Sequence, residues 1–331
     1  MAVRYVFRRL GFFLLTLWAA LTLNFFIPRF MPGSPLQALR DRTHNKLSPA
    51  ALEQLLTSFG FKPHQNIAMQ YLEYLKNMVT GNWGISIGAT MGEPVSTIVK
   101  QALPWTLGLV GVATLLAFGL GSLIGIVAGW KRGGKLDSVL PPVFVVTSAL
   151  PYFWVGLLLI LVFSVWTNGF LPSDFNYDTD LQPEWSLGFV ENVLKHAILP
   201  AATILITSVG GWILTMRNNM ITTLAEDYVR MGRAKGLSNR RIMSSYAARN
   251  ALLPNLSGFA MSLGFVISGA ILVEYVFNYP GLGYLLYNAV QNSDYPLMQA
   301  LFMLFTVAVL LALLICDFAI AWLDPRARAN G

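Results

Sequence analysis

The chain has 331 residues, of which 55% are apolar and only 12% are charged. Soluble domains carry about a quarter charged residues, so this composition excludes an ordinary water-soluble fold. The net charge of +7 does not indicate nucleic-acid binding, because the basic residues stand in short segments beside apolar runs, as topology signals do. One cysteine, Cys316, and three widely separated histidines predict neither a disulfide nor a metal site.

The first apolar run follows Arg4, Arg8 and Arg9 and is free of charge from Leu10 to Pro28. At about 1.5 Å per residue, the run is about 28 Å long, which is near the thickness of the hydrocarbon layer. A cleaved signal peptide is the alternative, but its apolar core is usually only about 7–15 residues long. We therefore predict a retained transmembrane helix in residues 1–30, with the N-terminus in the cytoplasm.

Residues 31–100 are mixed and polar, and we predict an extracytoplasmic helical segment there. The stretches LSPAALEQLLTSFGF and NIAMQYLEYLKNMVTG both show helical spacing of apolar residues. Ser48 before Pro49 is typical of a helix start, because serine caps the first turn and proline suits the first helical position.

Residues 101–323 contain five further apolar stretches, at about 103–130, 139–166, 197–216, 251–275 and 297–322. In the first, Gly121 and Gly125 form a GxxxG pattern that permits close approach of another helix without indicating which one. In the second, Pro141, Pro142 and Pro151 mark breaks or kinks.

Charged segments between these stretches alternate in sign. The turn 131–135 is basic, 168–195 has a net charge of −4, and 216–254 carries seven basic residues against two acidic ones. Basic loops lie in the cytoplasm. We therefore predict an all-α membrane protein with six transmembrane helices, both termini cytoplasmic, and a cytoplasmic tail at 324–331.

We find no constellation of residues for catalysis and predict that the chain is not an enzyme. An intramembrane serine protease is the enzymatic alternative, but the one span-associated histidine, His196, lies at an outer boundary. Glu274 and Asp317 are candidates for an ion or proton pathway, yet each stands at the predicted end of a span, where carboxylates are usually boundary residues. A stand-alone channel remains the alternative to a transport pore that is driven by another chain.

The basic loop 217–250 is the feature that favours a driven pore. It is predicted to form two short helices, with Gly236 ending the first and Ser238 capping the second. From the pattern alone, docking to a protein and contact with anionic lipid headgroups are equally supported. In the second helix one face is apolar, formed by Ile242, Met243, Tyr246 and Ala247.

The stretch DYVRMGRAKGLSNRRIMSSYAARNALLP resembles the cytoplasmic signature loop of the permeases of ABC importers, in particular the dipeptide and oligopeptide branch. Further stretches in the same order carry the resemblance over nearly the whole chain. They are RRLGFFLLTLWAALTLNFFIPRFMPGSP, FGFKPHQNIAMQYLEYLKNMVTGNWGIS, LPYFWVGLLLILVFS, ILVEYVFNYPGLGYLL, DYPLMQALF and LDPRAR.

This resemblance implies the fold of a type I ABC importer permease in residues 101–323 and location in the bacterial inner membrane. The implied partners are a second homologous permease, two ATPases that bind ATP and Mg²⁺, an extracytoplasmic substrate-binding protein and membrane lipid. No cofactor or metal is implied for this chain, and no nucleic acid.

The resemblance also implies roles for residues. A coupling helix within 225–237 would contact the ATPase through Tyr228, Val229, Arg230, Arg233, Ala234, Lys235, Gly236 and Leu237. Loop closure would involve Asn250, Leu253 and Pro254. Apart from the resemblance, the proline-broken segment around Pro151 makes Pro151, Tyr152 and Trp154, together with Glu274, candidates for lining the translocation path. Ordinary helix packing is the equally supported alternative for this segment. The implied cargo is a short peptide, with a small oligosaccharide or another small solute as the alternative.

Overall fold

The computed structural model describes residues 3–30, 65–88, 90–268 and 271–323, with a few isolated positions between 40 and 57. The named elements of this part are helices, and one antiparallel bridge joins Ile85 to Pro94. The chain forms two compact units. Residues up to 106, 267–271 and those from 280 onward form unit 1, whereas 107–266 and 272–279 form unit 2.

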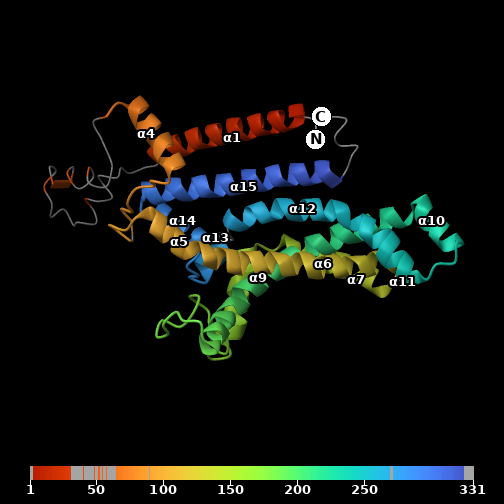
Figure 1. The fold of residues 1–331 in the computed structure, drawn as a ribbon. Coiled ribbons are helices and arrows are strands. Elements are labelled where there is room, and N and C mark those ends of the chain that lie inside the picture. Colours follow the sequence, from red (N-terminus) through yellow and green to blue (C-terminus); the bar gives the residue numbers. More distant parts are fainter. Residues whose placement is uncertain are drawn as a thin grey trace. The chain divides into compact units, whose positions relative to one another are not determined.

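In unit 1 two long apolar helices, α1 (Val3–Phe30) and α15 (Tyr295–Leu323), pack side by side (Figure 1). Their charged groups pair rather than face lipid singly, since Arg9 Nη1 lies 2.8 Å from Asp317 Oδ2. The Asn24 amide of α1 donates to the Tyr74 hydroxyl at 2.9 Å and to the Gln299 carbonyl at 2.8 Å. These bonds tie the first helix to two different parts of unit 1.

The predicted helix after residue 65 is confirmed as α4 (Ile67–Thr80). Its first turn is capped by Asn66, whose side chain accepts a bond from Ala68 N at 3.0 Å, and Gly81 ends it in the left-handed region with φ 77°. Serine capping at Ser48 is also confirmed, because Ser48 Oγ accepts from Ala51 N at 3.3 Å. Most of the predicted helix that follows Ser48, including Pro49, lies outside the described residues, as does the tail 324–331.

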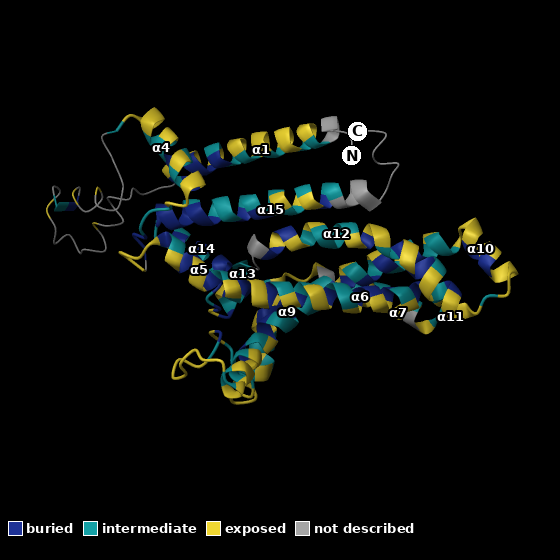
Figure 2. Ribbon diagram, in the orientation of Figure 1, coloured by how far each residue is buried: buried dark blue, intermediate teal, exposed yellow. Residues whose placement is uncertain are grey.

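The main core of unit 1 lies where α5 (Val95–Thr106), α14 (Leu282–Gln291) and the start of α15 meet. Figure 2 shows α15 buried over its first turns and more exposed toward its end. Fully buried members of this core are Ile87, Val95, Leu282, Met298, Ala300 and Leu301.

A buried carboxylate, Asp294, fixes the loop that precedes α5 to the first turn of α15. Asp294 Oδ2 accepts from Ser86 Oγ at 2.5 Å and from Gly88 N at 2.8 Å, and Oδ1 accepts from Ile87 N and Leu297 N, each at 3.3 Å. Asp294 is 1% exposed. Burial raises the pKa of this carboxyl, and the four donated bonds oppose that shift.

Unit 2 is built on the pair α6 (Val112–Trp130) and α9 (Leu187–Leu224). Gly121, Gly125 and Gly129 form one stripe of α6 against α9. A Cβ at Gly121 would lie 2.5 Å from Trp212 Cβ, and one at Gly125 would lie 2.7 Å from both Ile213 O and Met216 Cβ. The GxxxG prediction of close approach is therefore confirmed, and its partner is α9.

The other helices of unit 2 surround this pair. They are η1 (Leu107–Gly111), α7 (Lys135–Ala149), α8 (Tyr152–Ile160), η2 (Leu161–Val165), α10 (Asp227–Ala234), α11 (Asn239–Arg241), η3 (Ile242–Ala248), α12 (Arg249–Ser268) and α13 (Ile271–Val276). The elements η1, η2 and η3 are π-helical. A buried bond from Asn255 Nδ2 to Ser122 Oγ at 3.0 Å joins α12 to α6.

Two helices continue past positions where the sequence alone suggests a change. Helix α7 runs through Pro141 and Pro142 and ends only before Pro151, so only the last of these prolines coincides with a break. A helix between other helices can re-satisfy the carbonyls that proline leaves free. Helix α9 begins at Leu187, before the apolar stretch at about 197–216, and Ser186 caps it by accepting from Phe189 N at 3.3 Å.

In the part of the chain that the structure describes, four helices are long and apolar enough to cross a membrane: Val6–Phe30, Val95–Trp130, Leu187–Leu224 and Tyr295–Phe318. The segment Tyr152–Val165 is apolar but shorter. Helix α9, with 38 residues, is about 57 Å long at about 1.5 Å per residue, so it exceeds the hydrocarbon layer. All-helical architecture is confirmed for the described residues, whereas six spans and cytoplasmic termini stay predictions.

Candidate functional site

The basic loop after α9 consists of α10, a turn at Gly236, and a second helical segment formed by α11, η3 and the start of α12. Gly236 has φ 72°, a left-handed value that glycine adopts at little cost. The predicted pair of short helices with a glycine stop is thus present. Ser238 occupies the capping position before α11, but its side chain makes no capping bond.

A small hydrophobic core lies beneath this loop. Met216 and Met220 of α9 pack against the fully or nearly fully buried Ala247, Ala248 and Ala251 of the second segment. Val229 of α10 is 0% exposed. The predicted apolar face is confirmed in part: Ile242 and Ala247 are buried, and Met243 and Tyr246 are partly buried.

Polar and aromatic contacts hold the loop on its core. Asn250 Nδ2 donates to the Tyr228 hydroxyl at 2.8 Å and to the Tyr246 carbonyl at 3.1 Å, which joins the two helical segments. The Arg233 guanidinium carbon lies 6.0 Å from the centre of the Trp130 ring at the end of α6. This distance is at the outer limit of a cation–π contact.

The exposed side of the loop is basic. Of the residues predicted to contact an ATPase, Tyr228, Arg230, Arg233, Ala234, Lys235 and Gly236 are exposed, Leu237 is partly exposed, and Val229 is buried. Figure 2 shows the corresponding pattern along α10, which is mostly exposed with buried positions. Val229 therefore forms no part of the exposed surface.

The residues predicted to close the loop lie at the start of α12. Leu253 and Pro254 stand inside this helix, which continues to Ser268. Asn250 joins the two loop segments through its bond to Tyr228. The closing role of Leu253 and Pro254 stays a prediction.

The residues predicted to line a path differ in exposure, and their role stays a prediction. Pro151 occupies the capping position of α8, and Tyr152 and Trp154 are 40% and 56% exposed. Glu274, in α13, is 0% exposed. Both elements lie in unit 2, where a Cβ on Gly156 of α8 would be 3.2 Å from the Phe277 ring.

The other carboxylate considered for an ion pathway, Asp317, is paired with Arg9. An ion pair between neighbouring helices explains a charge in an apolar segment without a transport role. No group of three or more His, Cys, Asp or Glu side chains with metal-binding geometry occurs among the residues that the structure describes.

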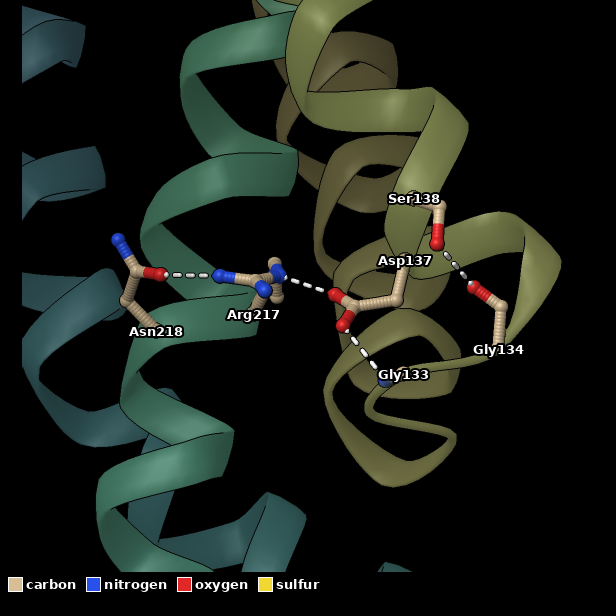
Figure 3. Close-up of polar contacts among 6 residues, drawn as sticks. All are labelled: Gly133, Gly134, Asp137, Ser138, Arg217 and Asn218. Carbon is tan, nitrogen blue, oxygen red and sulfur yellow. Dashed lines mark hydrogen bonds and ion pairs between the residues drawn. The ribbon is translucent and has the colours of Figure 1, made fainter.

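Sequence reasoning missed one interaction close to the loop, the ion pair of Asp137 with Arg217 (Figure 3). Arg217 Nε donates to Asp137 Oδ1 at 2.5 Å, and Gly133 N donates to Oδ2 at 2.8 Å. The bond from Arg217 is the main cause that lowers the pKa of Asp137. A signal was available, since Asp137 is the one acidic residue close to the basic turn 131–135.

Long apolar helices and a basic loop anchored on them define a helical integral membrane protein. Comparison identifies its family: residues 121–329 match the binding-protein-dependent transport system inner membrane component family, and the chain belongs to it. It is accordingly an inner-membrane protein.

Similar proteins cover nearly the full length. The oligopeptide transport system permease protein AppB of Bacillus subtilis is 34% identical over 97% of this chain and 98% of its own. The di/tripeptide transport system permease protein DppB of Pseudomonas aeruginosa is 32% identical over 98% of both chains. The dipeptide transport system permease protein DppB of Lactococcus lactis is 31% identical over 98% of this chain and 99% of its own. The resemblance to dipeptide and oligopeptide permeases is therefore confirmed.

Proposed function

We propose that this chain is a permease subunit of an ATP-driven importer that moves short peptides across the inner membrane. Energy would enter through the loop residues 228–237, which would dock on a partner ATPase. A second permease, a second ATPase and an extracytoplasmic binding protein would complete the importer. The names of the relatives support the class and the peptide cargo.

One observation carries the docking assignment: one side of the loop packs on a buried apolar core, and the other side is exposed and basic. Val229, Met216 and Met220 are all 0% exposed, whereas the positive charges of Arg230, Arg233 and Lys235 are accessible. A docking element must keep its shape when it is pushed, and a buried apolar underside gives it that stiffness. A loop that only touched lipid headgroups would instead present its apolar face to the membrane.

The test uses the assembled importer in proteoliposomes, with peptide uptake and ATP hydrolysis measured together. In Gly236→Val a β-branched residue replaces glycine at φ 72°, so the turn between the two loop segments must distort. We expect peptide transported per ATP hydrolysed to fall by about tenfold, within the usual range of coupling between sites. Helical content should be unchanged.

The matched control is Gly81→Val. Gly81 also ends a helix with φ 77°, and a Cβ there, as at Gly236, would meet nothing within 4 Å. It should cost similar backbone strain while leaving the ratio of uptake to hydrolysis unchanged. If Gly236→Val takes up peptide normally, or if both variants lose the same amount of transport per ATP, the docking assignment is wrong.

Cargo is tested separately, by calorimetry of the cognate binding protein with di- to pentapeptides and with cello-oligomers. Heat of binding with peptides and none with sugars is the expected result. The reverse would replace the peptide assignment with an oligosaccharide while leaving the docking assignment intact.

A further inference from the structure

The ion pair between Asp137 and Arg217 joins two segments that lie 80 residues apart in the chain. Asp137 stands in the first turn of α7, immediately after the basic turn 131–135, and Arg217 stands near the end of α9. Figure 3 shows the carboxylate between two donors, the Arg217 side chain and the backbone of Gly133. Arg217 also donates from Nη1 to Asn218 Oδ1 at 3.0 Å.

This pair is largely withdrawn from solvent, with side-chain exposures of 8% for Asp137 and 23% for Arg217. Each charge therefore depends on the other for solvation, since removing one partner leaves the other poorly hydrated. Asp137 has a second stabilising interaction, because a carboxylate in the first turn interacts favourably with the positive end of the helix dipole. The contact thus has a single preferred geometry.

The same part of α9 is fixed on two further sides. A Cβ on Gly129 of α6 would lie 2.5 Å from Met220 Cβ and 2.9 Å from the Arg217 carbonyl, so α6 and α9 are in backbone contact here. Met216 and Met220 in turn pack into the core under the loop. Asn219 Nδ2 donates to the Ala251 carbonyl at 3.2 Å, which ties α9 to α12.

These contacts form a continuous path from the loop to the α6–α7 turn. The loop rests on Met216 and Met220, the residues of α9 that flank Arg217 contact α6, and Arg217 itself holds the start of α7. The α6–α9 contact is made by glycine and so resists separation of the helices. It lies along α6. Helix α7 packs directly on α9 at another level, since a Cβ on Gly210 of α9 would lie 2.8 Å from Phe144 Cβ of α7. Asp137 adds a polar connection between the first turn of α7 and α9.

We propose that Asp137 and Arg217 are positioning residues for energy coupling: they make α7 move with α9 when the loop is displaced. This rests on the proposed function, which makes the loop the point of energy input. Neither residue touches an ATPase or the cargo in this role. Without the pair, ATP hydrolysis continues and the loop still docks, but the displacement reaches the first turn of α7 less completely, because only the packing of α7 on α9 passes it on.

The experiment measures peptide uptake and ATP hydrolysis together in the assembled importer. Asp137→Asn removes the charge and keeps an oxygen for Gly133 N, while Arg217→Gln removes the other charge. For each variant we expect a fall of about fivefold in peptide transported per ATP, the lower end of measured coupling between sites. The double variant should fall no further, because the two residues act through one contact.

Two further variants separate coupling from simple structural damage. Arg217→Lys keeps the positive charge and should recover part of the ratio. Arg9→Gln breaks the ion pair of comparable length in unit 1, Arg9 with Asp317 at 2.8 Å, and should leave the ratio at the wild-type value. A purely structural role would lower uptake and hydrolysis in proportion and would not change their ratio.

The outcomes distinguish this proposal from the one on which it rests. If Gly236→Val lowers the ratio while Asp137→Asn and Arg217→Gln keep the wild-type ratio, the loop couples and the ion pair does not. If Gly236→Val also keeps that ratio, the proposed function itself fails. If Asp137→Asn does not assemble, Arg217→Gln decides by the same measurement.

Discussion

Two carboxylates, Asp294 in unit 1 and Asp137 in unit 2, each hold a loop against the start of a helix, and they do so by different chemistry. Asp294 accepts four bonds, all from neutral groups, and is buried almost completely. Asp137 accepts one bond from a neutral backbone N–H and one from an arginine.

The difference determines how each contact responds to its surroundings. Neutral donors stabilise a buried negative charge incompletely, so desolvation raises the pKa of Asp294. An arginine offsets desolvation with opposite charge, so the pKa of Asp137 is lowered. The loop in unit 1 is therefore held by hydrogen bonds from neutral donors, whereas the turn in unit 2 is held by a hydrogen bond from a charged arginine.

The largest expected effect that tests this comparison is on stability. Asp294→Ala removes the acceptor of the Ser86 hydroxyl and of the Ile87 and Leu297 N–H groups, and we expect it to cost about 3 kcal/mol of unfolding free energy. Asp137→Ala leaves Arg217, which is 23% exposed and can rehydrate in part, and should cost about 1.5 kcal/mol. Denaturant unfolding of the purified chain in detergent measures both. Equal losses would mean that the two sites do not differ as described.

The next effect concerns pH and has opposite signs at the two sites. The contribution of Asp294 is fully present below the ordinary carboxyl pKa of about 3.9 and is lost as pH rises through its raised folded value. The contribution of Asp137 is present above that ordinary value and is lost as pH falls through its lowered folded value.

Unfolding free energies measured from pH 3 to pH 8 for the wild type, Asp294→Asn and Asp137→Asn test these signs. The advantage of the wild type over Asp294→Asn should shrink as pH rises from 4 to 7. Its advantage over Asp137→Asn should shrink as pH falls below about 4. If both advantages shrink in the same direction, the assignment of neutral and charged partners is wrong.

The smallest expected effect is the loss of stability when a single hydroxyl group near Asp294 is removed. Ser86→Ala removes the hydroxyl that lies 2.5 Å from Oδ2 and should cost about 1 kcal/mol. Thr90→Val is the matched control, since Thr90 donates at 3.1 Å to Ser86 and not to the carboxylate, and should cost about 0.5 kcal/mol. A larger loss for Thr90→Val would show that the hydroxyl network, rather than the carboxylate, carries the contact. Thermal midpoints in detergent suffice for this ranking.

Local rules in the sequence predicted much of the fold. Ser48 caps a helix as expected, because capping depends on neighbouring residues only. Asn66 and Gly81, which begin and end α4, follow the same local rules although no capping role was assigned to them from the sequence. Gly121 and Gly125 indicated a close helix contact for the same reason. No break occurs at Pro141 or Pro142, because proline ends a helix only when nothing nearby compensates for the lost bond.

In the candidate site, too, some features could be predicted from local sequence and others could not. The two loop segments and the turn at Gly236 follow from the order of residues, as does the basic character of the exposed side. The burial of Val229 and the pairing of Asp137 with Arg217 do not follow, because each depends on a neighbour that is distant in the chain. Which side chain meets which is set by the packing of α6 and α9, and local spacing carries little information about it.

The glycine stripe of α6 has a thermodynamic consequence. Within the span, α6 exchanges contact with lipid for contact with α9, so little apolar surface is taken from water. Heat-capacity changes on unfolding come mainly from apolar surface that becomes hydrated. The enthalpy of this helix pair should therefore vary little with temperature, whereas the small core beneath the loop should lose strength on cooling.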